Sequence, residues 1–316
     1  MLFYHNAEPI TGSTYMNREP NLTSSTPTPP SILSVPEATI SPFNLPTTKP
    51  LTTPSYTVSS QISTISREQS IMEAIETNVL QRNVKFDELP QTDNRILALN
   101  WLLDEDQMQL DPTDSNLNQR YILALLSFEL GPIPNLDLGS IPENAKDSVE
   151  WLSGEDECKW WLVTCSVNGD VRVLHLDGSL EPALYLEGTL PPEIGNLNQL
   201  TNLDLQSNFL SGTLPSEIGN LNELTVLFLG SNQFRGSVPS ELGNLNELIY
   251  LDLGYNMFSG SLPSELGLLK ELTTLNLESN QFTGTFPWNE TSKMTKLCFE
   301  YGNSFTGATP AEIECF

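Results

Sequence analysis

The second half of the chain repeats itself with a period of 24 residues, and this feature constrains the fold most. From about Val171, leucine, asparagine, glycine and proline each recur in register in successive copies. The columns are Leu200, Leu224, Leu248 and Leu272; Asn208, Asn232, Asn256 and Asn280; Gly212, Gly236, Gly260 and Gly284; and Pro191, Pro215, Pro239, Pro263 and Pro287. A fixed period of this length predicts a solenoid, in which each copy forms one coil and stacks on the next.

One copy shows what each coil must do. Leu200, Leu203 and Leu205 are expected to point inward from a short strand, and the strands of successive copies are expected to pair in parallel. The amide of Asn208 is expected to bond to backbone groups of neighbouring coils. Because one copy cannot exclude water alone, we interpret the four columns as scaffold rather than as a binding site.

A column of glutamates follows the same period, at Glu193, Glu217, Glu241 and Glu265. These carboxylates could bind cations, but the plainer interpretation is a first-turn glutamate on a solvated edge, where it suits the positive end of a helical turn. The two histidines are far apart in sequence, and no CxxC zinc motif is present. We therefore predict no metal and no cofactor.

The strand positions between the inward leucines are not used by the core. Because side chains alternate along a strand, these positions should gather on the concave face of the sheet. Aromatic and acidic side chains lie among them, which is typical of a surface that binds a basic or hydroxyl-rich partner, although a few exposed aromatics occur on any solenoid. The candidate ligand-binding residues are Asn202, Asp204, Gln206, Val226, Phe228, Tyr250, Asp252, Tyr255, Thr274, Asn276 and Glu278.

The first half of the chain has a different composition. Residues 1–68 are predicted to be a disordered stalk, because 29 of the 47 residues from Pro20 to Ser66 are Ser, Thr or Pro and such a segment cannot bury enough apolar surface to fold. Residues 69–150 form a predicted helical head of three helices, with Asp93 or Asn94 as the cap of the second. The head needs a partner surface, which we expect at the end of the repeats.

Residues 151–170 are a predicted cysteine-bearing cap, and residues 171–316 hold the repeats with a C-terminal cap. The cysteines form a close and a wider pair at the two ends of the repeats, which suits disulfides and an oxidising compartment; four reduced cysteines in a cytosolic protein are the alternative. They are Cys158, Cys165, Cys298 and Cys315. If the chain is secreted, Asn21 and Asn289 lie in glycosylation sequons.

The charge and hydropathy of the chain exclude several classes of partner. With 40 acidic against 14 basic residues, the formal net charge is −26, which disfavours nucleic acid because phosphate binding needs clustered Lys and Arg. No stretch approaches the roughly 20 apolar residues of a membrane-spanning helix, so no transmembrane segment is expected. The first ten residues show no export signal.

The repeat consensus LxxLxLxxNxFxGxLPSELGNL resembles the plant-type extracellular leucine-rich repeat. The stretch from Cys158 to Cys165, CKWWLVTC, looks like the N-terminal cap of that family, CxWxGVxC, with Leu162 at the place of the usual Gly. The segments RILALNWLLDED and QRYILALLSFELG resemble the head of algal receptor-like repeat proteins. This resemblance covers roughly residues 90–316. It implies a right-handed α/β solenoid, Cys158–Cys165 and Cys298–Cys315 disulfides, and a receptor-like ectodomain without a kinase.

The predicted function is a non-catalytic recognition module, extracellular or at the cell surface. Its ligand would be a protein, peptide or glycan on the concave face, with a co-receptor as a further partner. Two alternatives stay open, namely an inhibitor of an extracellular wall-degrading enzyme and a structural or adhesion protein; the alternative location is cytoplasmic. Phosphate-binding glycine loops, HExxH, GxSxG and kinase signatures are absent from the sequence, so we do not expect an enzyme.

Overall fold

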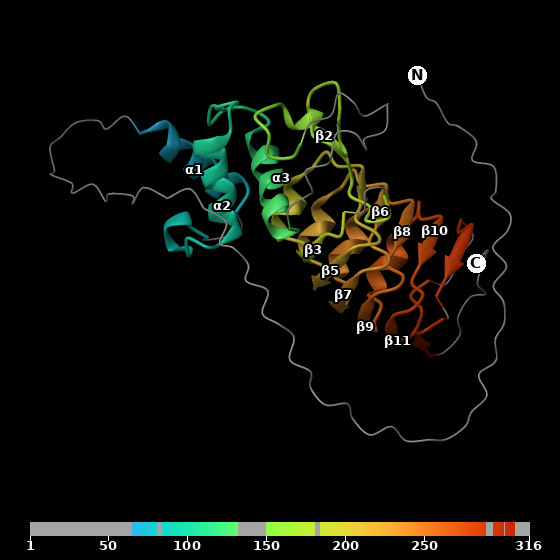
Figure 1. Ribbon diagram of the computed structural model, residues 1–316. Coiled ribbons are helices and arrows are strands. Elements are labelled where there is room, and N and C mark those ends of the chain that lie inside the picture. The colour runs from blue at the N-terminus through green and yellow to red at the C-terminus, as the bar shows by residue number, and fades with distance from the viewer. Residues whose placement is uncertain are drawn as a thin grey trace, which may run out of the picture. The chain divides into compact units, whose positions relative to one another are not determined.

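The structure is a computed structural model, and it describes residues 65–80, 84–131, 150–180, 184–288, 293–299 and 301–306. All of these residues belong to one compact unit, Ile62–Phe316. The predicted stalk lies outside them as far as residue 64, and so do the two sequons at Asn21 and Asn289. Figure 1 shows the helices of the head at one end of the repeats, which then follow one another along the molecule.

The larger of two sheets has one strand from every coil. Its seven strands lie in the order β1-β2-β4-β6-β8-β10-β12. Their bounds are Val163–Cys165, Val171–His175, Asn202–Asp204, Val226–Phe228, Tyr250–Asp252, Thr274–Asn276 and Lys296–Cys298. All neighbours pair in parallel except β1 and β2, which are antiparallel. The leucines that were expected to point inward are buried, which confirms the predicted solenoid with a parallel sheet.

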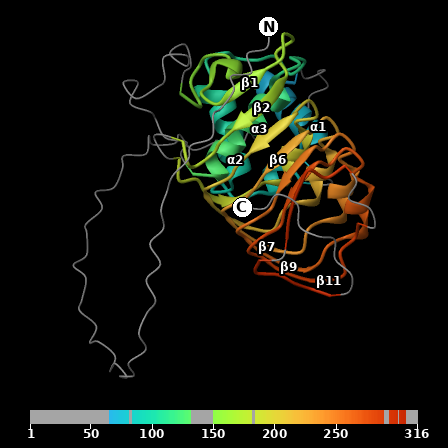
Figure 2. The same cartoon turned by 90° about the vertical axis from the view of Figure 1, so that its right-hand side faces the viewer.

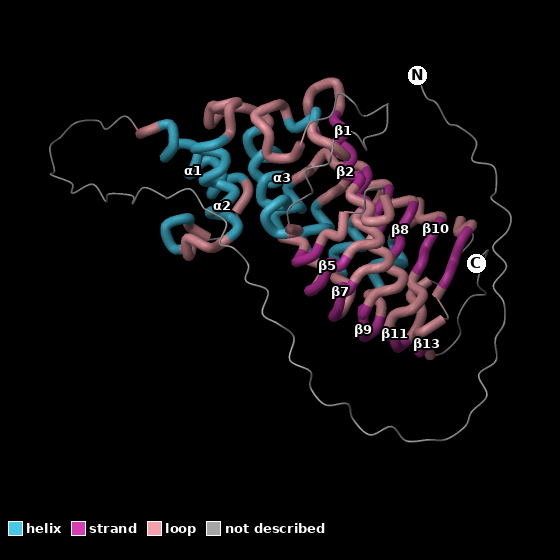
Figure 3. Tube along the Cα trace, viewed as in Figure 1, coloured by secondary structure: helices cyan, strands magenta, loops and turns pink. Residues whose placement is uncertain are grey.

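A second parallel sheet, which the sequence analysis did not predict, runs along another side of the coils (Figure 3). Its six strands lie in the order β13-β11-β9-β7-β5-β3. In chain order they are β3 Glu187–Thr189, β5 Phe209–Gly212, β7 Gln233–Gly236, β9 Met257–Ser261, β11 Gln281–Gly284 and β13 Ser304–Phe305. Behind it, Phe234, Phe258 and Phe282 stack with ring centroids 6.0 and 6.1 Å apart. Four of its strands end at or beside the glycine column, where Gly212 has a φ of 81°.

Short 3-10 helices return the chain from one coil to the next. They are η5 Pro192–Asn196, η6 Ser216–Asn220, η7 Ser240–Asn244 and η8 Ser264–Leu268. The glutamate column lies in their first turns; Glu241 and Glu265 are exposed as expected, and Glu217 is half-buried. For Glu193 the expectation of a solvated edge is wrong, because only 4% of this residue is exposed. The helical head packs on the first coil through α3, which contacts β3 and η5.

The asparagine column bonds the coils together. Asn232 Nδ2 donates to Leu205 O of the preceding coil at 2.8 Å, and Asn232 Oδ1 accepts from Leu210 N at 3.0 Å. The equivalent bonds are made by Asn208, Asn256 and Asn280. This confirms the predicted scaffold role, since buried backbone groups are costly to leave without a partner.

The head contains three α-helices, α1 Arg67–Asn78, α2 Asn94–Asn100 and α3 Leu117–Glu129. Between and after them lie η1 Phe86–Glu88, the π-helical turn η2 Trp101–Glu105 and η4 Glu157–Lys159. Asp93 caps α2 by accepting a hydrogen bond from Arg95 N at 3.0 Å, as predicted. The second predicted helix is α2, which continues directly into the π-helical turn Trp101–Glu105.

The head packs on the first coil, as expected, and shares its hydrophobic core. Glu187 N donates to Leu130 O at 3.1 Å, and Asn196 Nδ2 donates to Val79 O at 3.0 Å. Figure 2 shows α2 and α3 beside β1 and β2 at this end of the molecule. The head therefore closes the N-terminal end of the solenoid, whose first coil would otherwise expose its core.

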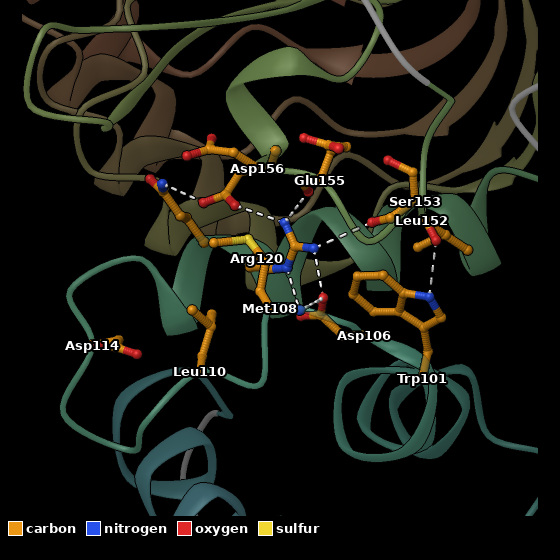
Figure 4. Close-up of polar contacts among 12 residues, drawn as sticks. Trp101, Asp106, Met108, Leu110, Asp114, Arg120, Leu152, Ser153, Glu155 and Asp156 are labelled. Carbon is orange, nitrogen blue, oxygen red and sulfur yellow. Dashed lines mark hydrogen bonds and ion pairs between the residues drawn. The ribbon is translucent and has the colours of Figure 1, made fainter.

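A fully buried arginine fastens the head to the cysteine cap (Figure 4). Arg120 of α3 donates through Nε and Nη2 to the Asp106 carboxylate at 2.6 and 2.7 Å, and through Nη1 to Glu157 Oε2 at 2.9 Å. Its guanidinium also lies 5.3 and 5.0 Å from the ring centroids of Trp101 and Trp160. The sequence analysis did not identify this cluster.

The cap itself has the pairing that the family resemblance implied, a Cys158–Cys165 disulfide. Leu162, at the place of the family's Gly, has a φ of 65°, so it adopts the left-handed conformation that a glycine would take without strain. Cys298 lies buried on β12, but Cys315 lies outside the described residues. The Cys298–Cys315 pairing therefore stays a prediction.

Candidate ligand-binding face

Two columns of side chains run across the concave face, which is the outward side of the seven-stranded sheet. Each strand of the repeats contributes one residue to each column, and the leucine between the two is buried. The Tyr250 column is Val173, Asn202, Val226, Tyr250, Thr274 and Lys296. The Asp252 column is His175, Asp204, Phe228, Asp252, Asn276 and Cys298. The strand register thus brings most of the predicted site residues onto one surface.

An aromatic pair lies in the middle of this face. Phe228 on β6 and Tyr250 on β8 pack edge to face, with ring centroids 6.5 Å apart. Tyr250 is 41% exposed, whereas Phe228 is half-buried. Within the Asp252 column, Phe228 is in register with Asp204 on one side and with Asp252 on the other. The apolar surface is therefore flanked by two carboxylates on adjacent strands.

The two carboxylates have different surroundings. Asp204 is buried, and its Oδ2 lies 3.0 Å from His175 Nδ1; this hydrogen bond raises the pKa of His175. Burial raises the pKa of the Asp252 carboxyl, although it accepts a hydrogen bond from Gly254 N at 2.8 Å. Asp252 Oδ1 lies only 2.9 Å from the position that a Cβ on Gly230 would occupy, so the glycine makes room for this carboxylate.

The remaining predicted residues lie beyond the strand ends. The Gln206 side chain donates a hydrogen bond from Nε2 to Asp177 Oδ2 at 3.1 Å, so one of its amide donors is already in use. Tyr255 follows the end of β8 in a turn with a φ of 53° and is 52% exposed, so it is on the rim rather than on the strand. Glu278 is the second residue after the end of β10 and is half-buried.

Comparison with known proteins then identifies the repeats. The family model described as "Leucine-rich repeat region" matches residues 171–303. This part of the chain is a leucine-rich repeat region. No curated protein matches the chain.

Several solved structures of plant receptors are similar to the chain. The ectodomain of GASSHO1/SCHENGEN3 from Arabidopsis thaliana, in complex with CASPARIAN STRIP INTEGRITY FACTOR 2, is 31% identical over 60% of this chain and 21% of its own, with a TM-score of 0.49. The plant peptide hormone receptor RGFR1 in complex with RGF2 is 42% identical over 38% and 20%, with a TM-score of 0.37. The SOBIR1 ectodomain from Arabidopsis thaliana is 27% identical over 62% and 98%, with a TM-score of 0.48. The chain thus spans about a fifth of the length of the first two.

Sequence analysis missed the contribution of the irregular first coil of the leucine-rich repeat region. His175 and Asp177 lie in line with the predicted residues, in the same column as Asp204 and in the turn beside Gln206. The sequence does indicate this coil, because Val171, Leu174 and Leu176 have the same spacing as the inward leucines of the later copies. With these residues, acidic side chains outnumber basic ones on the described part of the face.

Other features bear on what the leucine-rich repeat region can bind. Among the described residues, no group of three or more His, Cys, Asp or Glu side chains is placed to hold a metal ion. Within the same residues, no helix has the length and apolar character needed to cross a membrane.

Proposed function

We propose that the leucine-rich repeat region is a non-catalytic recognition module whose concave face binds a protein or peptide ligand through a basic segment. The observation that carries the proposal is the place of Phe228 between Asp204 and Asp252 in one column, next to the exposed Tyr250. A Lys or Arg side chain of the ligand can lie across an aromatic ring while its charge meets a neighbouring carboxylate.

The aromatic pair supplies the apolar contact that such a ligand needs. Aromatic residues at the centre of a surface often account for much of the binding energy, while polar residues around them provide orientation and specificity. Phe228 and Tyr250 have this central place, with Asn202, Thr274 and Asn276 on the neighbouring strands. We also propose a co-receptor as a further partner.

We further propose that the protein works outside the cell or at its surface. The Cys158–Cys165 disulfide supports this location, because disulfides persist in oxidising compartments. Intact mass of protein from its native source, with and without reductant, tests it together with the predicted Cys298–Cys315 bond and the sequons at Asn21 and Asn289. Four free thiols on unmodified protein would favour the cytoplasmic alternative.

Peptides selected from a displayed random library on the full chain test the concave face. We expect the selected peptides to be enriched in Lys and Arg, and we expect Phe228→Ala/Tyr250→Ala to weaken their binding by about thirtyfold or more, because both anchors are lost. The matched control is Tyr185→Ala/Phe209→Ala, which removes another exposed stacked pair, with centroids 6.0 Å apart, at the side of the second sheet. Thermal unfolding of both variants should stay close to that of the parent.

Equal loss of binding in both double variants, or in neither, would contradict the assignment of the concave face.

The identity of the native partner distinguishes the alternative functions from the proposed one. An inhibitor that docks its acidic face on a basic enzyme rim should bind that enzyme with an on-rate that falls steeply with ionic strength. A structural or adhesion protein should instead show weak multivalent contacts and no single partner, and a glycan ligand should compete with the selected peptides.

A further inference from the structure

A cavity of about 410 Å³ lies where the helical head meets the first coil, separate from the concave face. Residues 92–95 and Glu129 of the head form one side of it, and residues 189–193 of β3 and η5 form the other. This volume is in the range of small-molecule sites, which often lie between two packed parts of a protein.

The cavity is lined by more negatively charged than positively charged side chains. Asp93, Glu129 and Glu193 contribute three carboxylates, and Arg95 contributes the single guanidinium. Arg95 already donates to both oxygens of Asp93, from Nε at 2.8 Å and from Nη2 at 2.7 Å. Neither Glu129 nor Glu193 has an ion pair with any residue that the structure describes. Asn94 forms a side-chain hydrogen bond with Glu129, and the charge of Arg95 acts on both carboxylates, but neither has an ion-pair partner of its own.

Glu193 is the more informative of the two, because only 4% of it is exposed. Of its counterparts in later copies, Glu217 is half-buried, and Glu241 and Glu265 are exposed. Burial raises the pKa of the Glu193 carboxyl and also that of Glu129, and the negative charge of Glu129 raises the pKa of Glu193 further. A buried carboxylate is costly unless a cation or hydrogen-bond donors meet it.

We propose that this cavity binds an organic diamine, whose ammonium groups are held by Glu193 and Glu129. An ammonium group has three donors and no acceptor, which matches a lining of carboxylate oxygens and the hydroxyl groups of Thr92 and Thr189. Leu190, Pro191 and Pro192 offer an apolar surface for the carbon chain of the ligand. A diamine fits best, because its two charges would neutralise both unpaired carboxylates.

Acid should weaken this binding. A proton on Glu193 or Glu129 competes with the ammonium group for the same oxygens, and the raised pKa of both carboxyls extends this competition above the usual carboxyl range. The other charged or titratable groups that act on Glu193 are Arg95, Asp93 and Tyr121. Arg95 stays paired with Asp93, and burial raises the pKa of Tyr121 further from neutrality. The affinity should therefore fall as the pH is lowered from 7 towards the carboxyl range.

Calorimetric titration of the full chain with 1,5-diaminopentane tests the site. We expect saturable binding of the diamine and none of 1,5-pentanediol, which has the same chain without charge. Glu193→Gln should weaken diamine binding about thirtyfold or more, because one charged partner of the pair is lost. Glu241→Gln is the matched control, since it makes the same change in the same column on an exposed residue and should bind as the parent does.

Folding is monitored on the same samples. Without ligand, Glu193→Gln should unfold at the same or a higher temperature than the parent, because the amide removes a buried charge. If this variant does not fold, Glu129→Gln, which changes a half-buried residue, takes its place with the same expected loss of binding. The proposal is overturned if the parent does not bind the diamine, if the diol binds equally well, or if folded Glu193→Gln binds the diamine as tightly as Glu241→Gln does.

Discussion

The coils and the helical head are stabilised in different ways. In the coils each contact is repeated: the side-chain amides of Asn208, Asn232 and Asn256 donate to a carbonyl of the preceding coil at 2.7, 2.8 and 2.9 Å. In the head each contact occurs only once. Arg120, for example, donates two hydrogen bonds to the Asp106 carboxylate, and this contact is not repeated elsewhere in the described part of the head. The comparison shows that repetition spreads the stability of the array over many equal bonds, whereas the head depends on single clusters.

The largest effect should come from the head. Arg120→Ala leaves the buried carboxylates of Asp106 and Glu157 without their cation, and breaking a buried ion pair from one side costs roughly 3–5 kcal/mol. Denaturant unfolding measures this loss. Arg235→Ala, at an exposed arginine of β7, is the control and should change the free energy of unfolding by less than about 0.5 kcal/mol. Similar small losses in both variants would mean that the cluster does not hold the head to the cap.

A smaller effect is expected in the array. Asn232→Ala removes the hydrogen bond to Leu205 O, which keeps only its bond from Asn208 Nδ2, and leaves Leu210 N without its Asn232 acceptor; this should lower the free energy of unfolding by about 1–3 kcal/mol. The same measurement on Asn222→Ala, an exposed asparagine of the preceding copy, should show almost no change. A loss for Asn232→Ala that exceeds the loss for Arg120→Ala would reverse the comparison between the two regions.

The smallest expected effect is a pH dependence of protein stability, which comes from Glu193 at the junction between the head and the coils. The pKa of Glu193 is raised above its ordinary value of 4.5 in the folded protein, so the folded state holds this proton more tightly than the unfolded state does. The resulting stabilisation is complete below pH 4.5 and is lost as the pH rises through the raised pKa. Relative to the parent, Glu193→Gln should therefore gain stability as the pH rises, in thermal unfolding followed across this range. Glu241→Gln should follow the parent at every pH, and a parallel course for both variants would argue against a buried Glu193.

These regions also differ in how far the sequence predicts them. The coils could be predicted because the leucine spacing of Leu200, Leu203 and Leu205 repeats and fixes which side of each strand is buried. The second sheet could not, because its short strands beside the glycines have the composition of turns. The Arg120 cluster and the burial of Glu193 depend on contacts between segments far apart in sequence, for which no periodic signal exists. For the concave face, the sequence predicted which residues share a surface, while their role in binding stays a prediction.

Oxidative footprinting of the aromatic side chains, with and without a selected peptide, tests most directly whether the concave face is the binding face. Mass spectrometry then reports the oxidation of each ring. Bound peptide should protect Tyr250, which is 41% exposed in the free protein, and leave Tyr185 and Phe209 as reactive as before. Protection of Tyr185 and Phe209 with Tyr250 unchanged would place the ligand elsewhere and contradict the proposed recognition surface.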